Sequence, residues 1–137
     1  MLRFMLDTNL CIHVLRQPDT PVASRFKENE GALCISTVTL HELLHGAERS
    51  QRPAFQRALT EELTSRLSVL DFNASAANHS SNIHATLAKS GQLIGAYDML
   101  IAGHARSLGL TVVTNNLREF TRVEGLRCED WLARNNP

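Results

Sequence analysis

Two spacings of apolar residues alternate along the chain, and they predict short strands separated by helices. The predicted strands are the short runs 3–7 (RFMLD), 32–36 (ALCIS), 68–72 (SVLDF) and the β-branched run 110–114 (LTVVT). Between them, apolar residues recur three and four positions apart, as on one face of a helix. The order predicts an α/β domain whose central, mostly parallel sheet has four to five short strands flanked by helices.

Proline, glycine and capping residues indicate where the helices begin and end. Pro21 and Pro53 suit the first position of a helix, and Thr8 and Asn73 are suitable caps for helices that follow them. Gly91 is placed to end the long helix that starts after Asn73. Another helix is expected to begin at Asp98 and to lead into the strand at 110–114. The stretch 92–97 is expected to be a loop.

Length and composition limit the possible classes of protein. A chain of 137 residues with 43% hydrophobic and 20% charged residues suits one globular domain, expected over residues 1–132 with a short tail at 133–137. No apolar run reaches the length of a membrane span, and no secretory leader is evident. The three cysteines form no C-x-x-C pair, so a reduced, cytoplasmic protein is expected.

The charge balance does not by itself indicate a nucleic-acid partner. The formal net charge is zero, which argues against a nonspecific coat on nucleic acid, because such binding neutralises many phosphates. Twelve of the fourteen basic residues are arginine, whose planar guanidinium can bind phosphate oxygens in pairs. Salt bridges would explain the arginines equally well, so this observation permits RNA binding without indicating it.

Four acidic residues lie near the ends of predicted elements. Asp7 closes the first strand, Glu42 lies on the helix after the second, Asp98 begins the helix that leads to the last predicted strand, and Glu119 follows that strand. A parallel sheet can bring such positions together at its carboxyl edge. Clustered carboxylates are suited to one or two Mg²⁺ ions, which can activate water for hydrolysis of a phosphodiester.

Each acid also has a purely structural interpretation. Asp7 could simply end its strand, Asp98 could favour the positive end of its helix, and Glu42 could form a capping box with Thr39. Taken one at a time, these interpretations are at least as good as the metal site. The order of the motifs along the whole chain decides between them.

Four segments together resemble the PIN-domain ribonucleases. They are F-M-L-D-T-N at 4–9, S-T-V-T-L-H-E-L-L-H-G at 36–46, G-A-Y-D-M-L-I-A-G-H-A-R at 95–106 and T-N-N-L-R-E-F at 114–120. Within that family the chain is most similar to the enterobacterial-type VapC toxins of type II toxin–antitoxin systems, including V-E-G-L-R-C-E-D-W at 123–131. Any one segment is a weak signal, whereas the ordered combination is specific.

The resemblance implies a function and a set of site residues. It implies an endoribonuclease that depends on Mg²⁺ or Mn²⁺, forms a homodimer, and is inhibited by a VapB-type antitoxin in a hetero-oligomer. Within the subgroup the RNA substrate is initiator tRNA, cut in its anticodon stem-loop. The implied metal-holding acids are Asp7, Glu42 and Asp98.

The resemblance also implies supporting residues and leaves one position open. Thr8 and Asn9 lie beside the first acid, and Thr114 lies beside the last site position. Many PIN domains place an aspartate two residues after that threonine, where this chain has Asn116. Glu119 is the acid that can take this fourth role, if 117–120 forms a helical turn.

Two other functions compete with the ribonuclease. His41-Glu42-Leu43-Leu44-His45 fits H-E-x-x-H, the helical zinc motif of metalloproteases. That interpretation requires a third zinc ligand. The candidates are His79, His84 and His104, and no recognisable downstream motif contains them. The second alternative is a noncatalytic α/β binding module, because a fold does not imply activity. Three separated acids in positions that match the PIN motifs disfavour this alternative.

Overall fold

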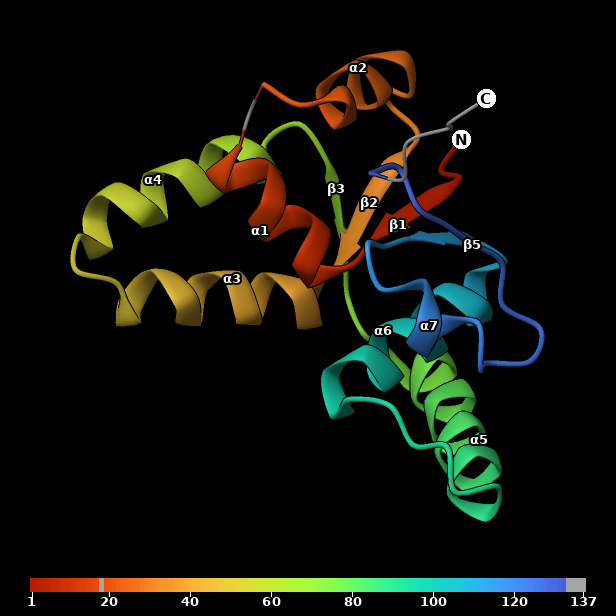
Figure 1. Cartoon of the computed structure of the whole chain (residues 1–137). Coiled ribbons are helices and arrows are strands. Elements are labelled where there is room, and N and C mark those ends of the chain that lie inside the picture. Colours follow the sequence, from red (N-terminus) through yellow and green to blue (C-terminus); the bar gives the residue numbers. More distant parts are fainter. Residues whose placement is uncertain (18, 133–137) are drawn as a thin grey trace.

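Five short strands form one parallel sheet in the order β3-β2-β1-β4-β5 (Figure 1). The computed structural model describes residues 1–17 and 19–132, so the tail expected at 133–137 lies outside the described residues. The strands are β1 (Phe4–Leu6), β2 (Leu33–Ser36), β3 (Ser68–Leu70), β4 (Thr111–Val113) and β5 (Cys128–Glu129). The α/β class and the parallel sheet were predicted correctly, and β5 is the strand that the apolar pattern did not locate.

Helices connect the strands and cover both faces of the sheet. They are α1 (Thr8–Arg16), α2 (Pro21–Glu28), α3 (Thr37–Arg49), α4 (Pro53–Thr64), α5 (Ala74–Lys89), α6 (Ala96–Leu108) and the one-turn α7 (Leu117–Phe120). Because side chains alternate along a strand, Phe4 and Leu6 pack with α1 to α4, whereas Met5 between them packs with α5 to α7. Both faces are buried, which explains why the central strands read as continuous apolar runs.

Two predicted helix starts need correction. Asp7, not Thr8, caps α1: its Oδ1 accepts a hydrogen bond of 2.8 Å from the Leu10 amide, which frees Thr8 for another contact. The second correction concerns α6, which begins at Ala96 after Gly95, so Asp98 lies inside the first turn and does not open the helix. Asn73 caps α5 as predicted, since its side chain accepts from the Ala76 amide.

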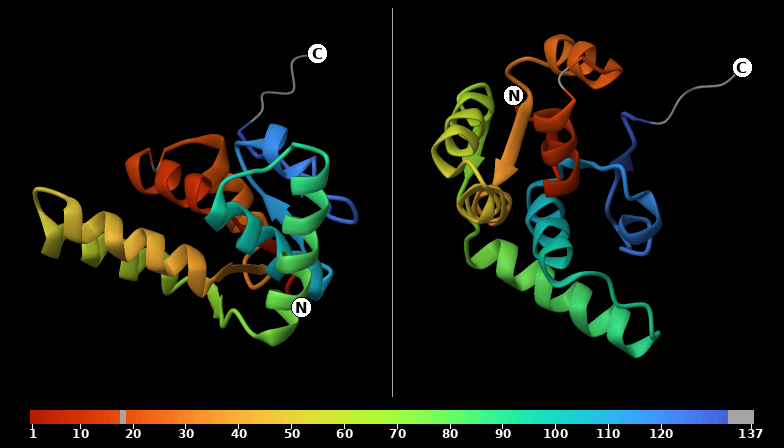
Figure 2. Two further views of the ribbon diagram at one scale, coloured as in Figure 1. Left: turned by 90° about the horizontal axis from the view of Figure 1, so that it is seen from below. Right: turned by 60° about the vertical axis from the view of Figure 1, so that its left-hand side comes forward.

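The helices form two pairs that extend from the sheet. The α3–α4 pair and the α5–α6 pair project in different directions (Figures 1 and 2). The second pair is packed very tightly, because a Cβ on Gly103 of α6 would lie 2.5 Å from the backbone nitrogen of Ser80 on α5. Only glycine allows that approach, and the contact fixes α6, the helix that carries Asp98.

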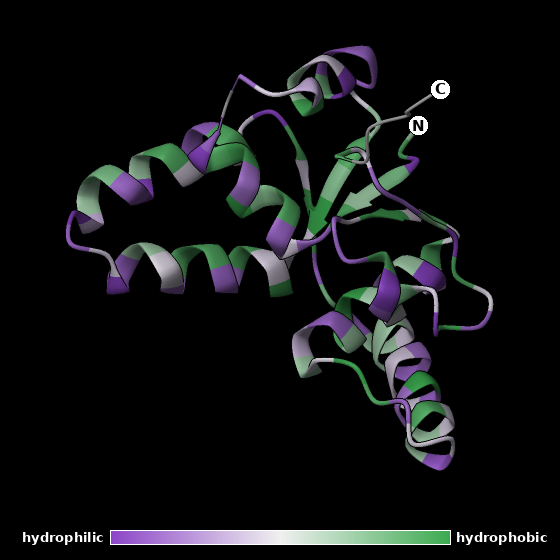
Figure 3. Ribbon diagram, in the orientation of Figure 1, coloured by the Kyte–Doolittle hydropathy of each residue, from purple (hydrophilic) through white to green (hydrophobic). Residues whose placement is uncertain are grey.

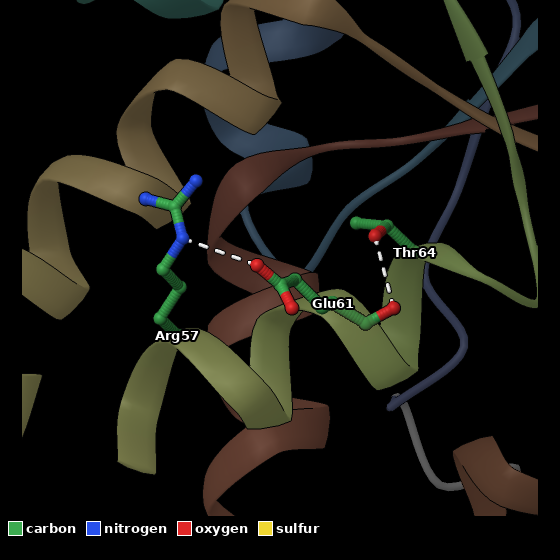
Figure 4. A network of polar contacts seen from close by, with 3 residues as sticks. All are labelled: Arg57, Glu61 and Thr64. Atoms are coloured by element: carbon green, nitrogen blue, oxygen red, sulfur yellow. Dashed lines mark hydrogen bonds and ion pairs between the residues drawn. The ribbon is translucent and has the colours of Figure 1, made fainter. Parts of the chain in front are cut away.

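Polar residues lie mainly on the outer helix surfaces, and the central strands are apolar (Figure 3). On the exposed face of α4, for example, Arg57 donates to Glu61 at 3.1 Å, and the Thr64 hydroxyl donates to the Glu61 carbonyl (Figure 4). Exposed i, i+4 pairs of this kind stabilise a helix by only about 0.3–0.5 kcal/mol.

Across residues 1–17 and 19–132, no helix has the length and apolar character needed to cross a membrane.

Candidate metal centre at the carboxyl edge of the sheet

The strand order reverses at β1, and the candidate site begins there. The chain builds outward from β1 to β2 and β3, then returns to place β4 and β5 on the other side of β1. Ligands of parallel α/β sheets bind at such a reversal, beyond the carboxyl ends of the strands. Asp7 follows β1 and Thr114 follows β4, so the two residues face each other at this point.

Asp7 is fully buried and held by two hydrogen bonds. Its Oδ2 accepts from the Thr114 hydroxyl at 2.6 Å, and its Oδ1 accepts from the Leu10 amide. Burial disfavours the charged carboxylate and raises the pKa of Asp7 to about 6. The two hydrogen bonds oppose this shift, whereas repulsion from Glu42 adds to it. Asp7 is therefore a fixed carboxylate in a site that disfavours its charge.

Glu42 comes from the second turn of α3 and is anchored by Thr8. The Thr8 hydroxyl donates to Glu42 Oε1 at 2.5 Å, and it lies 3.2 Å from the hydroxyl of buried Thr39. These bonds tie the start of α1 to the start of α3. They also turn the Glu42 side chain toward Asp7, whose pKa Glu42 raises by repulsion.

Asp98 and Glu119 form a second pair of acids in the same cluster. Asp98 projects from the first turn of α6 and shares a hydrogen bond with Glu119 of α7. Burial, this shared bond, and repulsion from Glu119, Asp7 and Glu42, in that order, raise the pKa of Asp98 to about 7. One oxygen of Glu119, Oε2, is buried without any hydrogen-bond partner. Among the described residues, no hydrogen-bond donor apart from the shared proton compensates the negative charge of this pair.

The asparagines of the candidate site lie to one side of the acids. Asn9 and Asn116 line a hollow of about 470 Å³ with His13 and Arg16, and none of the four acids lines it. The Asn116 backbone amide donates to the Thr114 hydroxyl at 2.7 Å. Asn116 therefore supports Thr114 through its backbone, while α7 brings Glu119 to Asp98.

The cluster suits a divalent cation chemically without being a preformed cage. Within residues 1–17 and 19–132, no three His, Cys, Asp or Glu side chains are grouped so that they could hold a metal ion as they stand. Instead, Asp7 and Glu42 each accept a hydrogen bond from a threonine hydroxyl, and Asp98 shares one with Glu119. The raised pKa values and the unpartnered Glu119 oxygen nevertheless mark a site that lacks positive charge.

The contacts of the H-E-x-x-H segment do not fit a zinc protease. Glu42 points to Thr8 and the acid cluster, and the His41 ring lies against Tyr97 at a centroid distance of 5.8 Å. No third ligand accompanies His41 and His45 in the described chain. Sequence reasoning also missed Thr39 as a member of the hydroxyl network; its position one helical turn before Glu42 was read only as a capping box.

Comparison with known proteins agrees with the geometry. The sequence model of the PIN domain family matches residues 4–126 of this chain. The tRNA(fMet)-specific endonuclease VapC of Shigella flexneri is 54% identical over 131 residues, covering 96% of this chain and 99% of that protein. The ribonuclease VapC2 of Haemophilus influenzae strain Rd is 48% identical over 132 residues, covering 96% of this chain and all of that protein.

Solved structures give the same result. The DNA-bound VapBC structure from Salmonella typhimurium includes a chain with a TM-score of 0.94 and 51% identity, and the match covers 96% of this chain and 99% of that one. VapBC-1 from nontypeable Haemophilus influenzae gives a TM-score of 0.88 at 34% identity, with 96% and 100% covered. These relatives exclude the metalloprotease and the noncatalytic module. The chain belongs to the PIN-domain family and is an endoribonuclease of the VapC type.

Proposed function

We propose that this chain is the toxin of a type II toxin–antitoxin pair and cuts RNA with Mg²⁺ held by Asp7, Glu42, Asp98 and Glu119. The observation that carries the proposal is the convergence of four acids from four separate segments on one partly buried edge of the sheet. Mutual repulsion of this kind destabilises a protein unless a bound cation relieves it. Carboxyl groups with strongly raised pKa values cluster at functional sites, so this repulsion supports a metal-binding active site here.

The metal expected here is a hard cation. Oxygen-only ligands favour Mg²⁺, with Mn²⁺ as a substitute, over zinc, which prefers imidazole and thiolate. When bound, such an ion would lower the pKa of a water molecule and stabilise the leaving oxygen of the phosphodiester.

The surrounding residues hold the acids in place for this chemistry. Thr114 and the Leu10 amide fix Asp7, and Thr8 fixes Glu42. The Asp98–Glu119 hydrogen bond needs a proton, so this pair gives up the proton when it becomes a ligand. Asn9 and Asn116 are assigned supporting roles toward the substrate.

The substrate proposed is initiator tRNA, cut in the anticodon stem-loop. Two relatives named tRNA(fMet)-specific endonucleases, at 54% and 51% identity over 131 residues, support this choice. A single-stranded loop also exposes the phosphodiester to a shallow edge site better than a paired stem does. The proposed place of action is the cytoplasm, where this RNA occurs.

The partner proposed is a small VapB-type antitoxin, in a hetero-oligomer built on a toxin homodimer. Structures of VapBC complexes contain chains similar to this one at TM-scores of 0.94 and 0.88. An antitoxin arginine placed among the four acids would supply the missing positive charge and displace the metal. Co-expression with the adjacent small protein should then restore growth, and failure to bind or protect would remove this partner.

The test of the proposed activity maps RNA ends after brief expression of the chain and of an Asp7→Asn variant. New 5′ ends at one position of the initiator tRNA anticodon loop should appear with the wild type and not with the variant. The purified protein should cut the same RNA with Mg²⁺ or Mn²⁺ and stop on chelation. Equal cleavage by folded Asp7→Asn protein would refute the assignment of the site.

A further inference from the structure

A row of aromatic rings leads away from the acid cluster, and the metal chemistry does not use it. Tyr97 precedes Asp98 on α6, and its ring lies 5.8 Å from that of His41 on α3. The His41 ring is stacked with His45 at 6.2 Å and an interplanar angle of 22°. Two different helices therefore contribute to one row of rings, which begins beside the proposed metal ligands.

The rings border a small hollow that also reaches Glu42. It measures about 160 Å³ and is lined by Thr8, Glu42, His41, His45, Arg49 and Tyr97, with Ile12 and Gly46 completing it. Sites for drug-sized ligands usually measure about 300–1,000 Å³, so this hollow suits one flat group. Because Glu42 lines it, anything bound there lies next to the acid cluster.

The row of rings is exposed to solvent, which a purely structural role does not explain. Tyr97 is 46% exposed, and both histidines are exposed. The only polar contact of the Tyr97 side chain in the described chain is a 3.5 Å contact with His41 Nε2. Large exposed aromatic groups in a row are the usual platform on which unpaired nucleobases stack.

An arginine with no partner lies at the far end of the row. His41, His45 and Arg49 are spaced i, i+4 and i+8, so they share one face of α3 over about 12 Å. Arg57 on α4 is paired with Glu61 (Figure 4), and Arg66, just after α4, is paired with Glu62. Arg49 has no hydrogen-bond or ion-pair partner among the described residues. Its guanidinium is available for a phosphate.

We propose that Tyr97, His41 and His45 form a stacking platform for an unpaired base of the RNA substrate, with Arg49 binding the adjoining phosphate. This inference rests on the proposed ribonuclease function and deepens it. The H-E-x-x-H histidines thereby gain a role as substrate-positioning residues, beside acids that hold the metal. The platform favours a flipped-out loop nucleotide over a paired stem, because a paired base cannot present its face.

The first test compares Tyr97→Leu, Tyr97→Phe and Phe55→Leu in cleavage of the initiator tRNA stem-loop. Tyr97→Leu should raise KM about 5- to 150-fold, the range for loss of one base–aromatic stack, with a smaller change in kcat. Tyr97→Phe should recover most of the loss, because the ring remains. Phe55 on α4 is also 46% exposed but lies outside the hollow, so Phe55→Leu should behave as wild type.

Stacking itself can be observed with 2-aminopurine placed at each loop position of the RNA. Binding to Asp7→Asn protein should quench one position, and adding Tyr97→Leu should abolish that quenching. Arg49→Gln should reduce the slope of log Kd against log salt by about 0.7, and the paired Arg57→Gln should not. A thermal melt of each variant shows whether it is folded.

Each outcome separates the two proposals. If the wild-type protein cuts no RNA, the proposed function fails and the platform fails with it. If RNA is cut and Tyr97→Leu leaves KM and quenching unaltered, only the platform is overturned. A pure kcat defect would show that Tyr97 orients Asp98, and a defect in antitoxin inhibition alone would assign the rings to the protein partner; both results contradict the proposal.

Discussion

The two halves of the acid cluster are held in opposite ways. Asp7 and Glu42 each accept a short hydrogen bond from a threonine hydroxyl, at 2.6 and 2.5 Å, and Asp7 also accepts from a backbone amide. Within the part of the chain that the structure describes, Asp98 and Glu119 share a hydrogen bond only with each other, and one Glu119 oxygen is buried without a partner. The first half is anchored, whereas the second half shares a proton.

This difference suggests a division of labour between the halves. Carboxylates fixed by hydroxyls and a backbone amide keep their geometry whether or not a cation is present. A pair of acids that shares a proton must lose it before both can act as ligands. We therefore expect the Asp7 half to define where a cation binds and the Asp98 half to set how binding depends on pH.

The largest effect is expected from the anchored half. Asp7→Asn keeps the shape of the side chain but removes the central negative charge, so RNA cleavage should fall at least about 1,000-fold. The fold should survive, because an amide can still accept from Leu10 and relieves the repulsion with Glu42. Cleavage assays beside a circular dichroism melt test this, with exposed Asp19→Asn as the control. Residual activity within tenfold of wild type would contradict the assignment.

The second prediction compares two positions after β4. Glu119→Gln should reduce cleavage about 100-fold, because it removes the charge that lies against Asp98. Asn116→Ala should cost less, since Asn116 contacts Thr114 through its backbone amide, which alanine retains. Cleavage rates are measured across a Mg²⁺ titration. Loss of a metal ligand should change the Mg²⁺ dependence or the maximal rate, whereas loss of a charge that only stabilises the end of α7 should leave both nearly unchanged. A severe defect in Asn116→Ala beside a normal titration in Glu119→Gln would reverse the two roles.

The third prediction removes the anchors themselves. Thr8→Val and Thr114→Val keep the volume of the side chain but delete the hydroxyls that hold Glu42 and Asp7. Loss of such supporting hydrogen bonds typically costs about 10- to 100-fold in activity or metal affinity. Thr114→Val should also destabilise the fold by about 1–3 kcal/mol, because it leaves a buried Asp7 oxygen unsatisfied. Thr121→Val, an exposed substitution at the residue after α7, is the control, and equal activity in all three would show that the anchors are dispensable.

Sequence reasoning located the anchored half more securely than the other. Asp7 follows a strand of buried apolar residues, so its position at the carboxyl edge follows from the strand order alone. The position of Glu119 depended on whether 117–120 formed a helical turn, which four residues of sequence do not decide. The structure contains that turn as α7, and it brings Glu119 to Asp98.

The features that were missed depend on contacts between distant segments. The hydrogen bond from Thr8 to Glu42 joins residues 34 positions apart. Thr39, which also contacts the Thr8 hydroxyl, was interpreted from the sequence only as part of a capping box with Glu42. The Tyr97–His41 contact spans 56 residues, so the H-E-x-x-H pattern suggested zinc when read locally. The strand β5 has only two residues, Cys128 and Glu129, which is too short for an alternating pattern to be recognised.

The smallest effect concerns pH and metal, and it tests the proton-sharing half. The pKa of Asp98 is raised to about 7 and that of Asp7 to about 6, so the folded protein binds these protons more tightly than the unfolded chain does. Without metal, these groups therefore stabilise the fold at low pH, and that contribution is lost as pH rises from about 4 through 7. Mg²⁺ competes with the same protons, so its stabilising effect should grow over the same interval. We expect Mg²⁺ to raise Tm by roughly 2 to 5 °C at pH 8 and by much less at pH 5.5. Thermal melts at both pH values, with Mg²⁺ or chelator, measure this difference.

In Glu119→Gln the pKa of Asp98 should fall, because the repulsion from a second carboxylate is gone, and the pH dependence should move to lower pH. A Mg²⁺ effect of equal size at pH 5.5 and 8 would show that the Asp98 half does not exchange its proton for the cation.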